Sequence, residues 1–228
     1  MNKEIKNYQD FIDMLLYAGF TMGGGNADGI YAIINWGWQE SPPYDTPVRW
    51  HTECKETDPW EWRIRVLDER NDIAYGKLFF KKSGLITREW YPYFLAARRG
   101  GLSFDDAYES GTISHTAKRI YDVVAANHSI PSHAIKQEAG FAREEKSAFD
   151  RGMTELQMAM YITTNGQQFR GHGMPSCTFC TVEDFWGEDV FAQAAKLGKA
   201  EAAEKIRQQV LALNPHAQDK KITKFIYG

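Results

Sequence analysis

Residues 112–182 carry the pattern that most restricts how this chain can fold: three helical stretches, then two strands that flank a glycine-rich loop. Ser114 is a helix N-cap, and apolar residues then recur at three- and four-residue steps. A second, short helix stops at Gly140, and a third, amphipathic one begins near Glu144. The strand at 176–181 closes the pattern. This is the order of a winged helix-turn-helix, so we expect a winged-helix module over 112–182.

The flanking segments predict a mainly α chain of the α+β class, with the winged helix packed on an aromatic-rich amino-terminal region (1–111) and followed by a helical tail (183–228). Asp58 gives the clearest local signal, because Pro and then Glu follow it as in a capped helix start. The expected elements outside 112–182 are helices at 5–16, 59–69, 87–97 and after Ser103, a strand at 30–38, a hairpin with its turn at 82–84 or else a helix ending at Gly84, and tail helices at 182–195, 200–213 and 220–226.

Length and composition exclude several classes of protein. The 228 residues are 43% hydrophobic and 25% charged, as in a globular chain, and the net charge of −3 demands neither nucleic acid nor membrane. No run of apolar residues is long enough for a transmembrane helix, and the first residues lack the apolar core of a secretion signal. Three cysteines are too few for a disulfide framework. We therefore expect a cytoplasmic protein.

Positive charge is concentrated in one part of the chain. Residues 1–62 hold 4 basic and 10 acidic side chains, net −6, whereas residues 63–99 hold 9 basic and 4 acidic, net +5. Such an excess can follow a phosphate backbone, although the solvated face of ordinary helices and a hairpin explains it as well. If double-stranded DNA is the partner, we expect backbone contacts from this region, the third helix and the loop between the two strands. The candidate contacts are Lys81, Lys82, Arg98, Arg99, Arg143, Lys146, Arg151 and Arg170.

The exposed side of the third helix argues against sequence-specific reading of DNA. Four carboxylates share it with only three basic residues, and each carboxylate near a phosphate costs Coulomb energy that a base must offset. A winged helix that serves as a scaffold without touching DNA is therefore an alternative. The carboxylates are Glu144, Glu145, Asp150 and Glu155.

Four of the seven tryptophans form two Trp-x-Trp pairs. Trp36 and Trp38 point to the same side of a strand, whereas Trp60 and Trp62 are about 200° apart on a helix. We expect Trp38, with Trp60 or Trp62 opposite, to line a cavity for a planar ligand or an extruded base. Plain core packing of the tryptophans is the alternative. The candidate pocket residues are Trp36, Trp38, Gln39, His51, Trp60, Trp62 and Arg63.

The chain has no complete metal or nucleotide motif. Cys177 and Cys180 have the spacing of half a zinc site, but on a strand they point to opposite faces and cannot bind one ion together. The glycine run at 23–25 lacks the Gly-Lys-Ser/Thr end of a phosphate loop. We predict no metal and no cofactor.

Two segments carry a resemblance to a known family: DPWEWRIRVL at 58–67 and AYGKLFFKKSGLITREWYPYFLAARR at 74–99. With the expected winged helix that follows, the chain resembles the AlkZ-related proteins of bacteria over residues 58–190. These are similar to the winged-helix DNA glycosylases of the AlkZ type, which hold DNA in a channel and excise alkylated or crosslinked bases. The Gln-x-Gln or Gln-x-Asp motif of those enzymes is absent, and the nearest pair, Gln39 and Glu40, is adjacent.

The resemblance implies a DNA-associated protein with a role in DNA repair and, if the chain is an enzyme, a DNA glycosylase. The alternative is a non-enzymatic winged-helix scaffold that binds a small planar ligand or a protein partner. The overall acidity and the acidic third helix favour this alternative, whereas the basic segment at 63–99 favours DNA.

Overall fold

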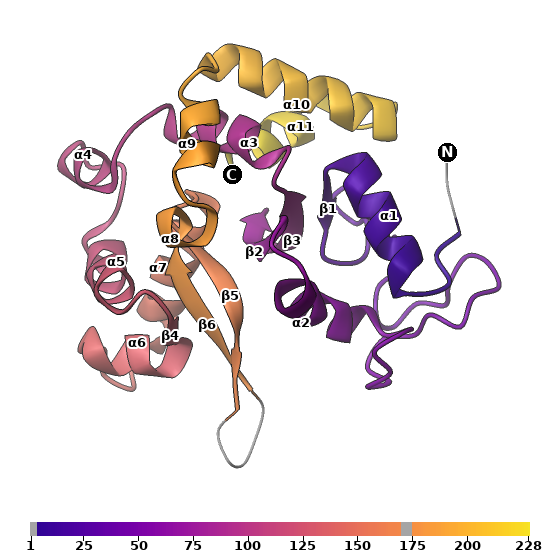
Figure 1. Ribbon diagram of the computed structural model, residues 1–228, viewed down its shortest axis with the longest axis horizontal. Coiled ribbons are helices and arrows are strands. Elements are labelled where there is room, and N and C mark those ends of the chain that lie inside the picture. Colours follow the sequence, from indigo (N-terminus) through magenta and orange to yellow (C-terminus); the bar gives the residue numbers. More distant parts are fainter. Residues whose placement is uncertain (1–3, 170–174) are drawn as a thin grey trace.

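A six-stranded antiparallel sheet runs through the computed structural model, which describes residues 4–169 and 175–228. The strand order is β1-β3-β2-β5-β6-β4, and helices pack around the sheet in an α+β fold (Figure 1). The strands are Phe20–Met22 (β1), Ile73–Phe79 (β2), Lys82–Thr87 (β3), Ile130–Pro131 (β4), Ile162–Gln168 (β5) and Ser176–Thr181 (β6).

The helices of the described residues form three groups, each packed over its own apolar core (Figure 1). The amino-terminal group is α1 (Tyr8–Ala18) and α2 (Pro59–Glu69). The second group lies around β4, β5 and β6 and comprises α4 (Phe104–Glu109), α5 (His115–Asn127), α6 (Ser132–Glu138) and α7 (Lys146–Met158). The third group is α3 (Tyr91–Arg99), α8 (Val182–Trp186), α9 (Glu188–Ala194), α10 (Lys199–Leu213) and α11 (Asp219–Tyr227).

One short stretch of the sheet joins the amino-terminal hairpin to the second helix group. β2 pairs with β5 only where Tyr75 lies opposite Thr164. Beyond this point α7 packs against β2, and the side chain of Gln157 accepts a hydrogen bond from the backbone N–H of Lys77 (2.9 Å). A side-chain amide thus takes the place of the missing strand partner, which keeps the buried backbone group satisfied.

The expected hairpin is confirmed, and its turn lies two residues earlier than expected. Phe80 and Lys81 form the turn with φ values of 51° and 62°, the left-handed pair typical of a two-residue hairpin loop. Gly84 is part of β3, where an added Cβ would lie 2.5 Å from the ring of Phe79. The alternative of a helix ending at Gly84 is wrong.

Three other expectations are corrected. Residues 30–38 are buried in part but form no strand; single hydrogen bonds, such as Met22 N–H to the Tyr31 carbonyl, hold them instead of a ladder. The helix expected from Thr87 begins only at Tyr91, because residues up to Thr87 are paired in β3. The helix expected over 182–195 is two helices, broken at Gly187, where φ is 72°.

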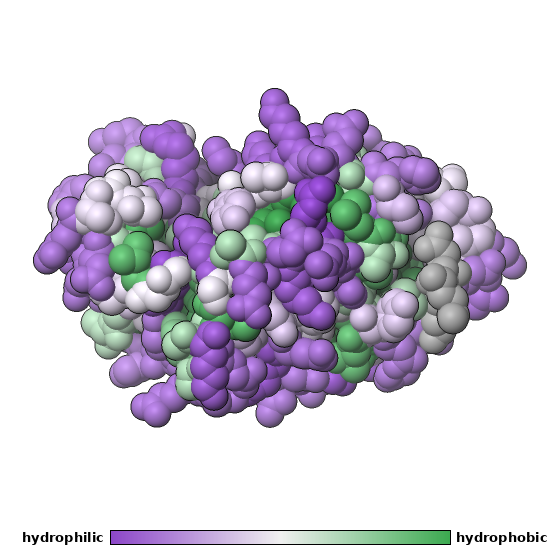
Figure 2. Space-filling view, turned by 90° about the horizontal axis from the view of Figure 1, so that it is seen from above, coloured by the Kyte–Doolittle hydropathy of each residue, from purple (hydrophilic) through white to green (hydrophobic). Residues whose placement is uncertain are grey.

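The surface seen from the side of α10 is mostly hydrophilic, and its apolar residues gather in small, separate areas (Figure 2). Within the described part of the chain, no helix combines the length and the apolar character needed to cross a membrane.

The guanidinium of Arg98, in the last turn of α3, links four elements. It donates hydrogen bonds to the backbone carbonyls of Leu78 in β2, Met158 at the end of α7, and Phe225 and Ile226 in the last turn of α11, all at 2.7–2.8 Å. Burial lowers the pKa of Arg98 to about 10, which still leaves the group charged at neutral pH. The second and third helix groups therefore meet around one cation.

Substitution of Arg98 tests this link. Arg98→Met should lower the free energy of unfolding by several kcal/mol, because four backbone carbonyls lose their donor and each unsatisfied buried polar group costs about 1–3 kcal/mol. Arg98→Lys should recover only part of it, because an ammonium cannot reproduce the guanidinium fork. Urea denaturation gives the measurement, and Arg143→Met, at an exposed arginine, is the matched control. Equal stabilities of the Arg98 and Arg143 variants would contradict the assignment.

Candidate functional site

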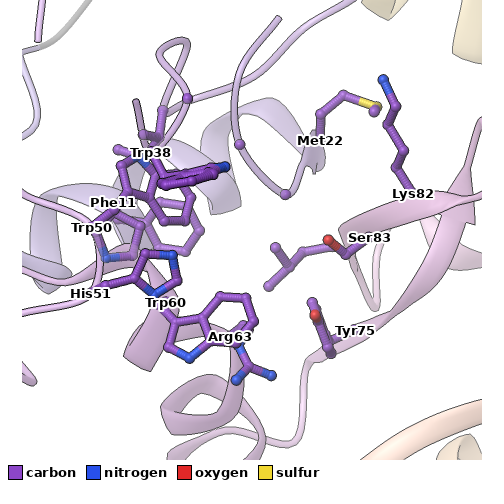
Figure 3. A pocket seen from close by; sticks show the side chains of 16 residues that line it. Phe11, Met22, Trp38, Trp50, His51, Trp60, Arg63, Tyr75, Lys82 and Ser83 are labelled. Atoms are coloured by element: carbon purple, nitrogen blue, oxygen red, sulfur yellow. The ribbon is translucent and has the colours of Figure 1, made fainter. Parts of the chain in front are cut away.

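A cavity of about 290 Å³, which we call the aromatic pocket, lies between α2, the segment 37–51 and strands β1 to β3. Figure 3 shows Trp38, Trp50, His51 and Trp60 along one side of it, across from Tyr75. Other side chains that line it are Phe11, Met22, Arg63, Lys82 and Ser83.

The imidazole of His51 lies among three tryptophans. Its ring centroid is 4.9 Å from that of Trp60, 6.2 Å from Trp38 and 6.5 Å from Trp50. These separations are those of favourable tilted and edge-to-face aromatic pairs. The four rings therefore form a continuous aromatic wall.

The carboxylate of Asp58 holds the two halves of this wall together. It is fully buried and accepts the backbone N–H groups of His51 (3.1 Å), Thr52 (2.7 Å), Glu53 (3.0 Å) and Trp60 (2.8 Å). His51 and Glu53 have φ values of 60° and 62°, a conformation that non-glycine residues rarely adopt without such support. The same carboxylate thus caps α2 and shapes the loop that carries His51.

Arg63 brings a charge to the pocket that no acidic group of the described residues neutralises. Its guanidinium carbon lies 3.7 Å from the centroid of the Trp60 ring, and its Nε is buried without a hydrogen-bond partner. Lys82, at the opposite side, pairs with Asp28 at 2.7 Å. No aspartate or glutamate of the described residues is among those that line the pocket.

The structure brings together part of the predicted pocket. Trp38, His51, Trp60 and Arg63 line it. Trp36 and Trp62 do not, because they are 3% and 1% exposed and belong to the core under α1, as the core-packing alternative expected. Gln39 lies outside the lining, so the expected polar group comes from His51 and Arg63.

Sequence reasoning missed the other lining residues, among them Trp50, Tyr75, Lys82 and Ser83. The alternation of Tyr75 along β2 and the register of β3 are the signals that could have found the strand residues, but both depend on the position of the turn. Trp50 lies in an irregular loop, where no periodic pattern reports orientation.

A second, more open cavity of about 1040 Å³, the α7 groove, runs along the exposed side of α7. Lys77 and Lys81 enter it from the β2–β3 hairpin, and Lys146 and Arg151 enter it from α7. Lys77 approaches α7 closely, with Nζ 3.4 Å from the hydroxyl of Thr154. The groove therefore collects cations from two segments that lie far apart in the sequence.

The predicted phosphate contacts separate into three sets. Lys81, Lys146 and Arg151 line the α7 groove, and Arg143 is exposed just before α7. Lys82 lies in the aromatic pocket. Arg170 lies outside the described residues.

Arg98 and Arg99 were expected to contact phosphates, but in the structure their guanidinium groups bind other parts of the protein. Arg98 borders the groove, but its N–H groups are engaged by backbone carbonyls. The side chain of Arg99 is 8% exposed, pairs with Glu183 at 2.8 Å and lies over the ring of Tyr161. Both arginines stabilise the interior.

Two of the four carboxylates on the third helix are occupied by protein partners. Glu145 accepts the N–H of Ala142 and lies 3.7 Å from Arg119. Glu155 accepts both the N–H and the hydroxyl of Ser114 at 2.7 Å. Glu144 and Asp150 keep carboxylates without a partner among the described residues, whereas Glu155, which also lines the groove, is held in place by neutral donors and keeps its negative charge.

Cys177 and Cys180 both lie in β6 and, as expected for a strand, point to opposite faces of it. Cys177 packs on the core under α5, whereas Cys180 is buried on the other face of β6, where burial raises its pKa to about 12. Among residues 4–169 and 175–228, no three His, Cys, Asp or Glu side chains gather as metal ligands would.

Comparison with known proteins decides the family. The model of the AlkZ-related family matches residues 5–227. The chain belongs to the AlkZ-related family. No curated protein matches it. Among solved structures, the DNA glycosylase AlkZ of Streptomyces sahachiroi is similar, with 13% identity and a TM-score of 0.42, over 74% of this chain and 50% of that one. The chain thus spans about half the length of that enzyme.

The role of Asp58 in this AlkZ-related protein gives a test of the pocket. In Asp58→Asn, the amide oxygen can serve two of the four N–H donors, but the NH₂ group faces the other two. The free energy of unfolding should fall by roughly 2–4 kcal/mol, because each unsatisfied buried donor costs about 1–3 kcal/mol. Denaturation followed by tryptophan fluorescence reports both stability and the pocket. Asp45→Asn, exposed in the preceding loop, is the control, and an equally small effect at both sites would disprove the role.

Proposed function

We propose that this AlkZ-related protein binds double-stranded DNA through the phosphate backbone, with the α7 groove as the contact surface. The observation that carries the proposal is that the hairpin residues Lys77 and Lys81 line the same groove as Lys146 and Arg151 of α7. Cations spaced along a groove are what neutralises a row of phosphates.

We infer that residues 112–182 form a winged helix. The order α5, β4, α6, α7, β5, β6 supports this, as does the pairing of β4 with β6 next to the β5–β6 hairpin. In winged helices and related folds the third helix approaches DNA. That helix is α7 here, and it forms one side of the groove.

The charges in the groove favour backbone contacts over base reading. Lys77, Lys81, Lys146 and Arg151 share the groove with three carboxylates, those of Glu144, Asp150 and Glu155. The described part of the groove has no Asn or Gln side chain, the usual readers of adenine. We therefore expect binding with little sequence preference.

Membership of the AlkZ-related family supports DNA as the partner. We do not assign base excision to the chain. It lacks the spaced glutamine motif, Gln39 does not line the aromatic pocket, and the Glu40 carboxylate accepts the N–H of Gly37.

Charge reversal in the groove tests the proposal. The variant Lys81→Glu, Lys146→Glu, Arg151→Glu should lower affinity for a fluorescent duplex by roughly 100-fold or more at low salt, because three cations become anions. The plot of log affinity against log salt concentration should become shallower for the variant. Its slope should change by about 0.9 for each phosphate that the variant no longer neutralises. Fluorescence anisotropy across a salt series gives both numbers.

The control is Lys196→Glu, Lys205→Glu, Lys220→Glu, which changes the net charge equally at exposed lysines outside the groove. It should keep most of the affinity. Equal losses in the two variants, or no binding by the unaltered protein at about 50 mM salt, would overturn the proposal.

A further inference from the structure

The aromatic pocket has the composition of a ligand site. Two tryptophans at its mouth face solvent, with Trp38 66% and Trp60 39% exposed. Large rigid aromatic rings left open to water beside a cavity mark a surface that a planar group can cover by stacking. The volume of about 290 Å³ is near the lower end of ligand pockets, roughly 300–1,000 Å³, and suits one ring system with its substituents.

The charges around the pocket determine whether an anionic or a cationic ligand is favoured. Three tryptophans and a histidine would suit a quaternary ammonium ion if the site were neutral or acidic. Here Arg63 and Lys82 line the cavity, and no aspartate or glutamate of the described residues does, although Asp28 beside it pairs with Lys82. The guanidinium of Arg63 has no carboxylate partner in the described part of the chain, and its buried Nε lacks an acceptor. The unpaired guanidinium would attract an anion, whereas a cation would be repelled.

Polar groups also lie where the edge of a ring would meet the protein. His51 projects from the aromatic wall and Ser83 from the side opposite it (Figure 3). Gly24 brings the backbone against the Trp50 ring, where an added Cβ would lie 2.5 Å from Cη2. The backbone therefore approaches the Trp50 ring more closely than any other residue at this position would permit.

We propose that the aromatic pocket binds a single nucleotide, with the base stacked against the Trp38 and Trp60 wall and the phosphate held by Arg63. The site stands on its own geometry and does not depend on duplex binding in the α7 groove. The β2–β3 hairpin contributes to both cavities, because Lys82 lines the pocket and the neighbouring Lys81 lines the groove. The nucleotide therefore has two sources, an unpaired base of bound DNA or a free mononucleotide.

Binding of the four deoxynucleoside 5′-monophosphates is measured by quenching of tryptophan fluorescence and by calorimetry. At least one should bind, and the matching nucleoside and deoxyribose 5-phosphate should each bind roughly tenfold or more weakly, because each lacks one half of the recognition. The groove variant Lys81→Glu, Lys146→Glu, Arg151→Glu should bind the mononucleotide normally. The nucleotide-binding proposal for the pocket and the DNA-binding proposal for the groove can therefore be tested independently.

Two substitutions test the contacts. Trp38→Ala should weaken nucleotide binding by roughly 5- to 150-fold, the range for one base stack, and Arg63→Gln by roughly tenfold or more. The exposed residues Tyr17 and Arg143 lie outside the pocket, so Tyr17→Ala and Arg143→Gln are the matched controls and should bind normally. Because Trp38 is mostly exposed, its variant should melt as the unaltered protein does.

A second arm identifies the source of the nucleotide. Affinity is compared for a fully paired duplex and for the same duplex with one bulged base. Preference for the bulge that Trp38→Ala abolishes indicates an extruded base, and mononucleotide binding without such a preference indicates a free nucleotide. Absence of both, or nucleotide binding that neither Trp38→Ala nor Arg63→Gln weakens, would overturn the proposal.

Discussion

The convergence of helix ends on one cation organises much of this protein. Arg98 lies in the last turn of α3, and its guanidinium meets the last residue of α7 and the last turn of α11. Carbonyls at a helix end lack partners within the helix and carry partial negative charge. The guanidinium of Arg98 satisfies three carbonyls at two such ends, and a fourth in β2, without a carboxylate. The α7 groove is bordered by the elements that this contact joins, so its shape depends on an arginine that is itself unavailable to phosphate.

The aromatic pocket depends on the opposite arrangement, a buried anion among backbone N–H groups. Asp58 shapes the loop of His51 and caps the helix that carries Trp60 and Arg63. One side chain therefore sets the position of His51 relative to Trp60 in the aromatic wall. The β2–β3 hairpin then connects the pocket with the groove, because Lys81 and Lys82 at its turn line different cavities. The buried charges of Arg98 and Asp58, each bound to backbone groups, and the β2–β3 hairpin therefore position the α7 groove and the aromatic pocket.

Local signals predicted those elements whose ends are set by neighbouring residues. The cap at Asp58 and the start of a helix after Ser103 lie where the sequence indicated. The strand expected at 30–38 failed for a physical reason. Apolar content shows that a segment is buried, but a strand also needs a partner with free hydrogen-bonding groups, and residues 30–38 meet only single donors and acceptors.

The site residues divide in the same way. Trp60 and Trp62 are two positions apart on α2, so the sequence showed that only one of them could face the pocket, and Trp60 does. The sequence could not show that Arg98 and Arg99 turn inward, because an arginine side chain reaches carbonyls of distant elements as readily as a phosphate.

The sequence by itself determined most of the helix boundaries, the α+β class and the residue types available for stacking and charge. Each of these depends on propensity, capping and periodicity over a few neighbouring positions. Only the tertiary structure decided which tryptophans remain exposed, which carboxylates of α7 are occupied, and which lysines share a cavity. These properties depend on contacts between residues tens of positions apart, and such contacts exist only after the sheet register and the helix packing bring them together.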